Sequence, residues 1–185
     1  MAGRTAGGGV RRPEGDAGRA WDARRYLDGL DTAHLRPVLD LARRATGFPA
    51  AMVNVLDLDT QHTVAVIGLD RVDALPRHLS LCDTVVRTEQ PLVLPDASRD
   101  SGFRDNLRVR TGMIGAYVGV PVRGREGAVV GTLCVTDARP HPVLPAQVEC
   151  LQQLAEVVRA HLDLLRGLRD HLRGLDDLPA WPAAG

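Results

Sequence analysis

The sequence predicts an α+β fold in which helices flank one antiparallel sheet. Two pairs of β-branched runs, at residues 51–67 and 114–135, each enclose a short polar or glycine-containing turn, as antiparallel neighbours do. Apolar residues recur at helical spacing before the first pair and after the second. The 185 residues are enough for one domain with a sizeable core and too few for two.

The chain is predicted to have three parts. Residues 1–25 are rich in glycine and arginine, with few large apolar side chains, which predicts a disordered tail. Residues 26–170 form the folded domain, including most of a long C-terminal helix. Residues 171–185 are expected to be the end of that helix and a flexible tail.

Residues 31–46 are predicted to form the first helix. Asp31 or Thr32 can cap its start, and Gly47 followed by Pro49 ends it. Its apolar stripe consists of Leu35, Val38, Leu39, Ala42 and Ala45.

A hairpin and a short helix follow. Residues 51–57 and 62–67 are two strands around a polar turn, and His62 is expected to face solvent. Ser80, with Asp83 three residues later, is expected to cap a helix that runs to Arg87.

Cys82 falls in the first turn of this short helix, and two interpretations stay open. The helix dipole there favours a thiolate, so an accessible Cys82 would be the most reactive thiol of the chain. Alternatively, Cys82 is a small core residue beneath the sheet. The other cysteines, Cys134 and Cys150, are too far apart for metal-ligand spacing, and no structural metal is predicted.

Residues 91–94 are predicted to be a short edge strand, and Asp96 lies in the turn that follows. Residues 100–109 are predicted to form a short helix or an irregular lid. In this segment Phe103 and Leu107 are expected to face inward, and Arg104, Asp105 and Arg108 outward.

The second hairpin is predicted to have two unlike faces. One face is aliphatic: Ala116, Val118, Val120, Val122, Val129, Gly131, Leu133 and Val135. The other is small or polar: Gly115, Tyr117, Gly119, Pro121, Val130, Thr132, Cys134 and Thr136. Alternation alone leaves open whether this second face is the floor of a ligand cavity or a half-exposed surface.

Residues 145–175 are predicted to form one long helix with heptad spacing. Beyond about His161 no sheet is left to cover the apolar stripe, which favours a parallel homodimer. Its seam would contain Leu151, Leu154, Val158, Leu165, Leu168 and Leu172. The alternative is an amphipathic helix that folds back on its own domain.

Charge and hydropathy narrow the range of partners. The 23 basic residues, all arginine, balance 23 acidic ones, which gives no electrostatic case for nucleic acid or an anionic membrane. No apolar run is long enough to span a membrane, and the N-terminus lacks the apolar core of a signal peptide. A cytoplasmic protein is therefore expected.

The order of several segments resembles the GAF domains, regulatory modules of phosphodiesterases, phytochromes and many bacterial sensors. Residues 118–122 and 130–137 resemble the last two central strands of these domains. Residues 79–86 and 91–97 resemble the helix, strand and aspartate that precede them in bacterial members. The resemblance covers about residues 30–165 and implies a lid over a ligand pocket on one sheet face, with the terminal helices on the other.

The resemblance implies a non-catalytic sensory module that binds an unidentified small molecule and signals through its dimerising helix to a separate protein. No particular cofactor is implied. The pocket would be lined by Cys82, Asp96, Phe103, Tyr117, Thr132, Cys134 and Thr136.

Departures from the family pattern exclude two classes of ligand. Two alternatives to the sensory function remain. The chain has no lysine, so the asparagine-lysine pattern of cyclic-nucleotide-binding members is missing. Thr136 and Asp137 replace the histidines that contact the pigment in bilin-binding members. One alternative is a free methionine sulfoxide reductase using Cys82, although the lid has no cysteine and Cys134 lies inside a strand. The other is a structural dimerisation module without a ligand.

Overall fold

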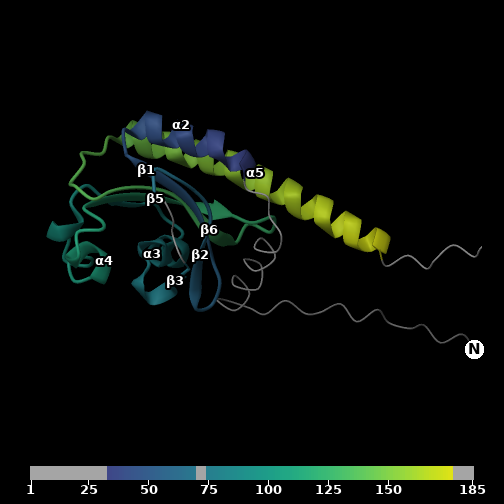
Figure 1. Ribbon diagram of the computed structural model, residues 1–185, viewed down its shortest axis with the longest axis horizontal. Coiled ribbons are helices and arrows are strands. Elements are labelled where there is room, and N and C mark those ends of the chain that lie inside the picture. The colour runs from purple at the N-terminus through teal and green to yellow at the C-terminus, as the bar shows by residue number, and fades with distance from the viewer. Residues whose placement is uncertain (1–32, 70–73, 177–185) are drawn as a thin grey trace, which may run out of the picture.

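One six-stranded antiparallel sheet forms the centre of the molecule (Figure 1). The computed structural model describes residues 33–69 and 74–176, with side chains to residue 172. In these residues the strand order is β3-β2-β1-β6-β5-β4. The strands are β1 Ala50–Leu56, β2 Thr60–Ile67, β3 Leu75–Pro76, β4 Leu92–Leu94, β5 Ala116–Arg123 and β6 Val129–Asp137.

Helices cover both faces of the sheet. The N-terminal helix α2 (Arg36–Thr46), preceded by the 3-10 turn Ala33–Leu35, and the long helix α5 (Pro145–Asp176) pack together on one face (Figure 1). The helices α3 (Leu81–Thr88) and α4 (Leu107–Arg110) lie on the other face, with the 3-10 turns Arg77–Leu79 and Ala97–Arg99. The α+β class and the two-sided arrangement predicted from the sequence are confirmed. The predicted tail at residues 1–25 lies outside the described residues, as do residues 177–185.

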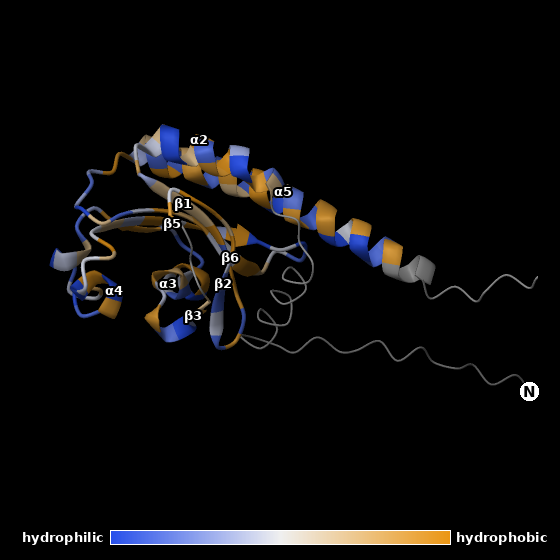
Figure 2. Ribbon diagram, in the orientation of Figure 1, coloured by the Kyte–Doolittle hydropathy of each residue, from blue (hydrophilic) through white to orange (hydrophobic). Residues whose placement is uncertain are grey.

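Each face of the sheet has its own apolar core, because alternate side chains of a strand point to opposite faces. Figure 2 shows apolar residues on the sheet and on the helix faces turned toward it. The core under α2 and α5 includes Leu39, Val118 and Leu133, and the core under α3 includes Val85, Tyr117 and Cys134.

The predicted alternation of β6 is wrong at its first two residues. Val129 belongs to the core under α3, and Val130 to the core under α2 and α5. The pairing of β5 with β6 has a bulge between Val122 and Arg123, where Val122 pairs with Gly131 but Arg123 pairs with Val129. A bulge shifts the alternation by one residue, so the two valines exchange faces.

The first hairpin and the C-terminal end of α2 match the sequence-based expectations. Gly47 ends α2 in the left-handed conformation, with φ of 77°, and its N–H donates to the Arg43 carbonyl at 2.7 Å. The expected caps, Asp31 and Thr32, lie outside the described residues. The exception is His62, which was expected to face solvent but is half-buried, because its Nε2 lies 3.2 Å from the carboxylate of Asp57 at the other end of the turn.

The segment before β5 turns two side chains opposite to the prediction. Leu107 is 54% exposed, whereas Arg108 reaches into the molecule; Phe103 packs inward as expected. The cause is the cap of α4. Asn106 accepts from the Arg108 N–H at 2.9 Å and donates to the Leu79 carbonyl at 3.1 Å, which fixes the direction in which α4 leaves the loop.

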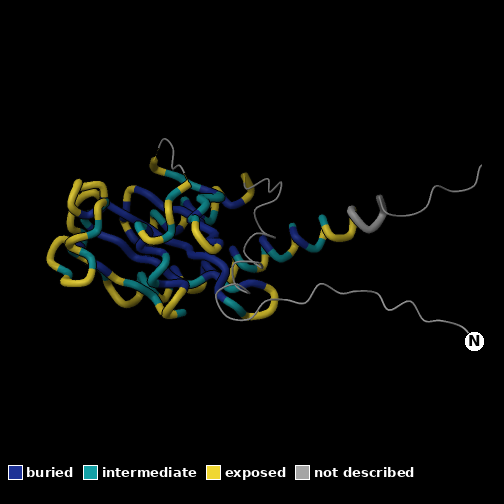
Figure 3. Tube along the Cα trace, turned by 90° about the horizontal axis from the view of Figure 1, so that it is seen from below, coloured by how far each residue is buried: buried dark blue, intermediate teal, exposed yellow. Residues whose placement is uncertain are grey.

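The first half of helix α5 packs against the domain, and its second half extends beyond the sheet (Figures 1 and 3). Leu151, Leu154 and Val158 are buried in the core of their own chain, so the predicted dimer seam is wrong at these three positions. Further along, Leu165 is half-buried, and Leu168 and Leu172 are 54% and 60% exposed. None of the helices within residues 33–69 and 74–176 is both long and apolar enough to cross a membrane.

Candidate functional site

The start of α3 is held against the sheet by Ser80. Its hydroxyl oxygen accepts from the Cys82 N–H at 3.0 Å, which caps the helix. The same hydroxyl donates to the side-chain carbonyl of Gln61 on β2. Cys82, in the first turn, is therefore buried between α3 and the sheet, in agreement with the core interpretation of this residue.

Asn54 on β1 connects two thiols that are far apart in the sequence. Its Nδ2 donates to Cys82 Sγ at 3.4 Å and to Cys134 Sγ at 3.3 Å. Its Oδ1 accepts from the Thr63 hydroxyl at 2.7 Å, which orients the amide so that the NH2 group faces the sulfur atoms. The pairing of β1 with β6 places Asn54 beside Thr132 in this layer, with Cys134 two residues further along β6.

Tyr117 on β5 supplies a further donor to Cys82, with its hydroxyl 3.2 Å from Sγ. The ring lies over Gly119. A Cβ at position 119 would overlap the Tyr117 hydroxyl and lie 2.7 Å from Cζ. The glycine is therefore required for the ring position that brings the hydroxyl to the thiol.

These contacts make the Cys82 thiol a stronger acid than the Cys134 thiol. The interaction with the Cys134 thiol is the main cause that lowers the pKa of Cys82 to about 6, against the effect of burial. The Thr132, Tyr117 and Ser80 hydroxyls act in the same direction. Cys82, together with burial, raises the pKa of Cys134 well above its usual value. Burial and then the two cysteines raise the pKa of Tyr117. Near neutral pH the negative charge therefore resides on Cys82.

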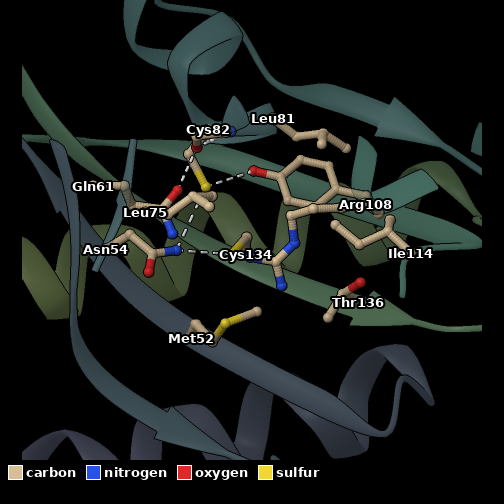
Figure 4. Close-up of a pocket in the computed structure, with 12 residues that line it drawn as sticks. Met52, Asn54, Gln61, Leu75, Leu81, Cys82, Arg108, Ile114, Cys134 and Thr136 are labelled. Atoms are coloured by element: carbon tan, nitrogen blue, oxygen red, sulfur yellow. Dashed lines mark hydrogen bonds between the residues drawn. The ribbon is translucent and has the colours of Figure 1, made fainter. Parts of the chain in front are cut away.

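A cavity of about 30 Å³ lies beside the thiols (Figure 4). This volume holds one or two molecules of the size of water. The strands β1, β2, β3, β5 and β6 contribute to its walls, together with α3, α4 and the loops on that side of the sheet. The lining residues are Met52, Asn54, Gln61, Leu75, Ser80, Leu81, Cys82, Arg108, Ile114, Tyr117, Cys134 and Thr136.

A groove of about 710 Å³ adjoins this cavity and shares Leu75, Arg108 and Thr136 with it. Arg108 extends in among the cavity residues (Figure 4). Its Nε is buried and has no hydrogen-bond partner among the described residues. The groove is mostly apolar, with Leu79, Leu107 and Met113 among its walls.

Comparison with known proteins identifies the family. A family model described as GAF domain matches residues 33–162, which is more than half of the chain. The chain belongs to the GAF domain family. Its fold agrees with that of solved GAF domains.

Several proteins resemble this GAF domain. A cyclic di-GMP phosphodiesterase of Pseudomonas aeruginosa is 33% identical over 141 residues, which are 70% of this chain and 24% of that protein. The chain thus spans about a quarter of the length of this curated relative. The GAF domain of an Acinetobacter phosphoenolpyruvate-protein phosphotransferase superposes with a TM-score of 0.60 at 19% identity, covering 83% of this chain and 92% of that one.

A free methionine-R-sulfoxide reductase of Neisseria meningitidis superposes with a TM-score of 0.59 at 15% identity, covering 80% of this chain and 88% of that one. At this identity the likeness concerns the fold alone.

The GAF fold brings most of the predicted site residues together. Cys82, Tyr117, Cys134 and Thr136 line the cavity, and Thr132 is buried in the same layer outside its wall.

Two predicted site residues lie elsewhere. Asp96 caps the turn Ala97–Arg99, accepting from the Ser98 N–H at 3.1 Å and from its hydroxyl, which lowers the pKa of the carboxyl. Phe103 packs against the core under α3 and lines neither the cavity nor the groove.

Sequence reasoning missed Asn54 and Arg108. A signal for Asn54 existed, because an asparagine in the apolar strand Ala50–Leu56 has to find buried partners. No local pattern distinguishes Arg108 from Arg104 or Arg110, since its inward direction depends on the contact of Asn106 with Leu79.

Proposed function

We propose that this GAF domain is a sensory module that binds a small molecule carrying a carboxylate or phosphate group in the groove beside Arg108. The observation that carries the proposal is the Arg108 side chain, which lines the apolar groove with a buried Nε and has no ion-pair partner among the described residues. A buried charge without a partner is destabilising, and a bound anion would relieve that cost.

The chemistry of Arg108 selects the ligand class. A guanidinium presents a planar fork of donors that matches carboxylate and phosphate oxygens in a bidentate contact. The other charged side chain among the described residues of the groove, Asp137, has neighbours of its own: the His141 ring at 3.6 Å and the Arg139 guanidinium at 3.9 Å. The groove therefore offers Arg108 to an anion, and its size falls within the range of small-molecule sites.

The groove also adjoins the segment that leads to α5. Thr136, Asp137 and Ala138 line it and are followed by the connection to α5. His141 in that connection and Gln147 in the first turn of α5 are both tied to the end of α2: their Nε2 atoms lie 3.3 and 3.0 Å from the Thr46 carbonyl. A ligand that prefers one arrangement of this segment would shift the population of α5 positions. We propose that the exposed half of α5 transmits this change through a homodimer to a separate protein partner.

Two arginines on one helix provide the test. Arg108→Gln and Arg110→Gln remove the same charge from α4, but Arg110 is exposed and outside both the cavity and the groove. Thermal unfolding is followed with increasing inorganic phosphate and acetate as probes, with chloride at equal ionic strength as the reference.

We expect the wild type and Arg110→Gln to be stabilised by at least one probe, by about 1.4 kcal/mol at ten times the dissociation constant. Arg108→Gln should show no stabilisation. Native mass spectrometry of the three purified proteins should find a retained anionic molecule in the first two only. Equal stabilisation of Arg108→Gln, or no response of the wild type to either probe and no retained molecule, contradicts the proposal.

The reductase alternative has less support. The structure does bring Cys134 to Cys82, but the cavity at the thiols holds only one or two water-sized molecules, too little for methionine sulfoxide.

A further inference from the structure

We propose that Cys82 and Cys134 form a dithiol that a hydroperoxide converts into an intramolecular disulfide. The proposal does not depend on the anionic ligand, because it concerns the small cavity at the thiols and not the groove.

The two sulfur atoms share one hydrogen-bond donor, which limits their separation. Both accept from the same Asn54 Nδ2, at 3.4 and 3.3 Å, so their separation is at most the sum of these distances, 6.7 Å. Cys82 is in a helix and Cys134 in the adjacent strand, so rotation of the two side chains changes this distance without altering the sheet.

The surroundings of Cys82 favour its thiolate, which is the nucleophilic form. Asn54 and Tyr117 donate hydrogen bonds to Sγ, and the start of α3 adds its dipole. The ionisable groups that surround the thiol from each packed element are Asp83 on α3, Arg108 on α4, Tyr117 on β5 and Cys134 on β6. Asp83 is paired with Arg77 at 2.5 Å, so its charge is compensated.

Size selects the oxidant. Both thiols line the cavity of about 30 Å³, and both are buried. A small hydroperoxide such as hydrogen peroxide fits this volume, whereas aromatic disulfides and other bulky thiol reagents do not.

The reaction balances in two steps. The Cys82 thiolate attacks one peroxide oxygen: an S–O bond forms, the O–O bond breaks, and the leaving oxide takes up a proton to give water or an alcohol. Cys82 sulfur is thereby oxidised to sulfenic acid. The loss of charge from Cys82 removes the main cause of the high pKa of Cys134. Cys134 sulfur then attacks Cys82 sulfur, an S–S bond forms, and the S–O bond breaks to release water, whose second proton comes from the Cys134 thiol.

The full-length Cys150→Ser variant tests this reaction, because it leaves only the proposed pair; Cys150 lies on the opposite side of the sheet. After equimolar hydrogen peroxide, we expect a monomer lighter by two hydrogen atoms, with no free thiol after denaturation. The double variant Cys134→Ser and Cys150→Ser should instead gain the mass of one oxygen atom, from sulfenic acid on Cys82. Retention of both free thiols, or direct oxidation of Cys82 to sulfinic acid in the variant that keeps Cys134, would overturn the proposal.

The pH profile of the reaction provides a second readout, which reports the acidity of Cys82 in the folded protein and not the stability of a variant. A pKa of about 6 makes Cys82 mostly thiolate at pH 7, so the rate should fall below pH 6 and stay level above pH 7. An ordinary thiol near pKa 8.5 would keep gaining rate up to about pH 9. Tyr117→Phe keeps the ring but removes the donor, which should raise the midpoint by about one pH unit. A midpoint near 8.5 in the Cys150→Ser protein, equal to that of its Tyr117→Phe variant, contradicts the proposed thiolate.

Discussion

Gly119 and Tyr117 show how a single missing side chain positions a functional group. The Tyr117 ring occupies the space that a side chain at position 119 would need, and this brings its hydroxyl to 3.2 Å from Cys82 Sγ. The small residues of this sheet face are thus required by close packing. Gly131 is another example, since a Cβ there would overlap the Asn54 carbonyl oxygen.

Gly119→Ala should lower the free energy of unfolding by about 1–3 kcal/mol, because the ring has to leave its position in a packed core. It should also raise the pKa of Cys82, because the Tyr117 donor moves away. Urea unfolding and the pH dependence of thiol oxidation measure the two effects. Gly167→Ala on α5 is the control: a Cβ there meets nothing within 4 Å, and helix propensity predicts a gain of up to about 1 kcal/mol. Equal effects of the two substitutions would contradict this account.

Helix α5 has different partners along its length. In its first half one apolar face is buried against the sheet and α2, through Leu151, Leu154, Ala155, Val158 and Leu162. Beyond the sheet, an exposed apolar stripe continues through Leu164, Leu168 and Leu172, and Val157 extends it backward on the same side. These residues lie within about one third of the helix circumference, as the contact face of a paired helix does. The homodimer that we propose therefore uses this stripe and not the buried residues of the first half.

The double variant Leu164→Glu and Leu168→Glu should be a monomer in sedimentation at concentrations where the wild type is a dimer. Both side chains are exposed, so the free energy of unfolding at monomeric concentrations should change by less than about 0.5 kcal/mol. Leu41→Glu, at an equally exposed position of α2, should leave the dimer intact. A wild type that stays monomeric at high micromolar concentration rules out this interface.

At the scale of the whole molecule, two apolar cores share one sheet. The core under α2 and α5 stabilises the terminal helices, whereas the core under α3 contains the thiols and the cavity. Because the same strands supply both cores, neither can unfold while the other keeps its full support. We expect cooperative unfolding of the described domain.

Leu39→Ala on α2 and Leu81→Ala on α3 remove the same atoms from the two cores. Each should lower the free energy of unfolding by about 2–5 kcal/mol and keep a single transition. Urea unfolding followed by far-UV circular dichroism measures this. A second transition in either variant would show that the cores unfold independently.

The hairpins, helix caps and amphipathic helices could be predicted from the amino-acid sequence, because neighbouring residues encode them. Alternation predicted both hairpins, and Ser80 and Gly47 marked helix ends that the structure has at these residues. Part of the site was also predictable, since Tyr117, Cys134 and Thr136 follow from alternation along the two strands of the second hairpin.

The contacts between residues that are distant in the sequence could be found only in the folded structure. Asn54 joins Cys82 and Cys134 through strand order and the seating of α3, which local periodicity does not contain. Arg108 faces inward because Asn106 is hydrogen-bonded to the Leu79 carbonyl in a distant loop. The first leucines of the heptads are buried because they pack against the sheet of their own chain, which leaves no surface there for a partner helix. In each case competition among nonlocal contacts selects between arrangements that the sequence pattern leaves equally possible.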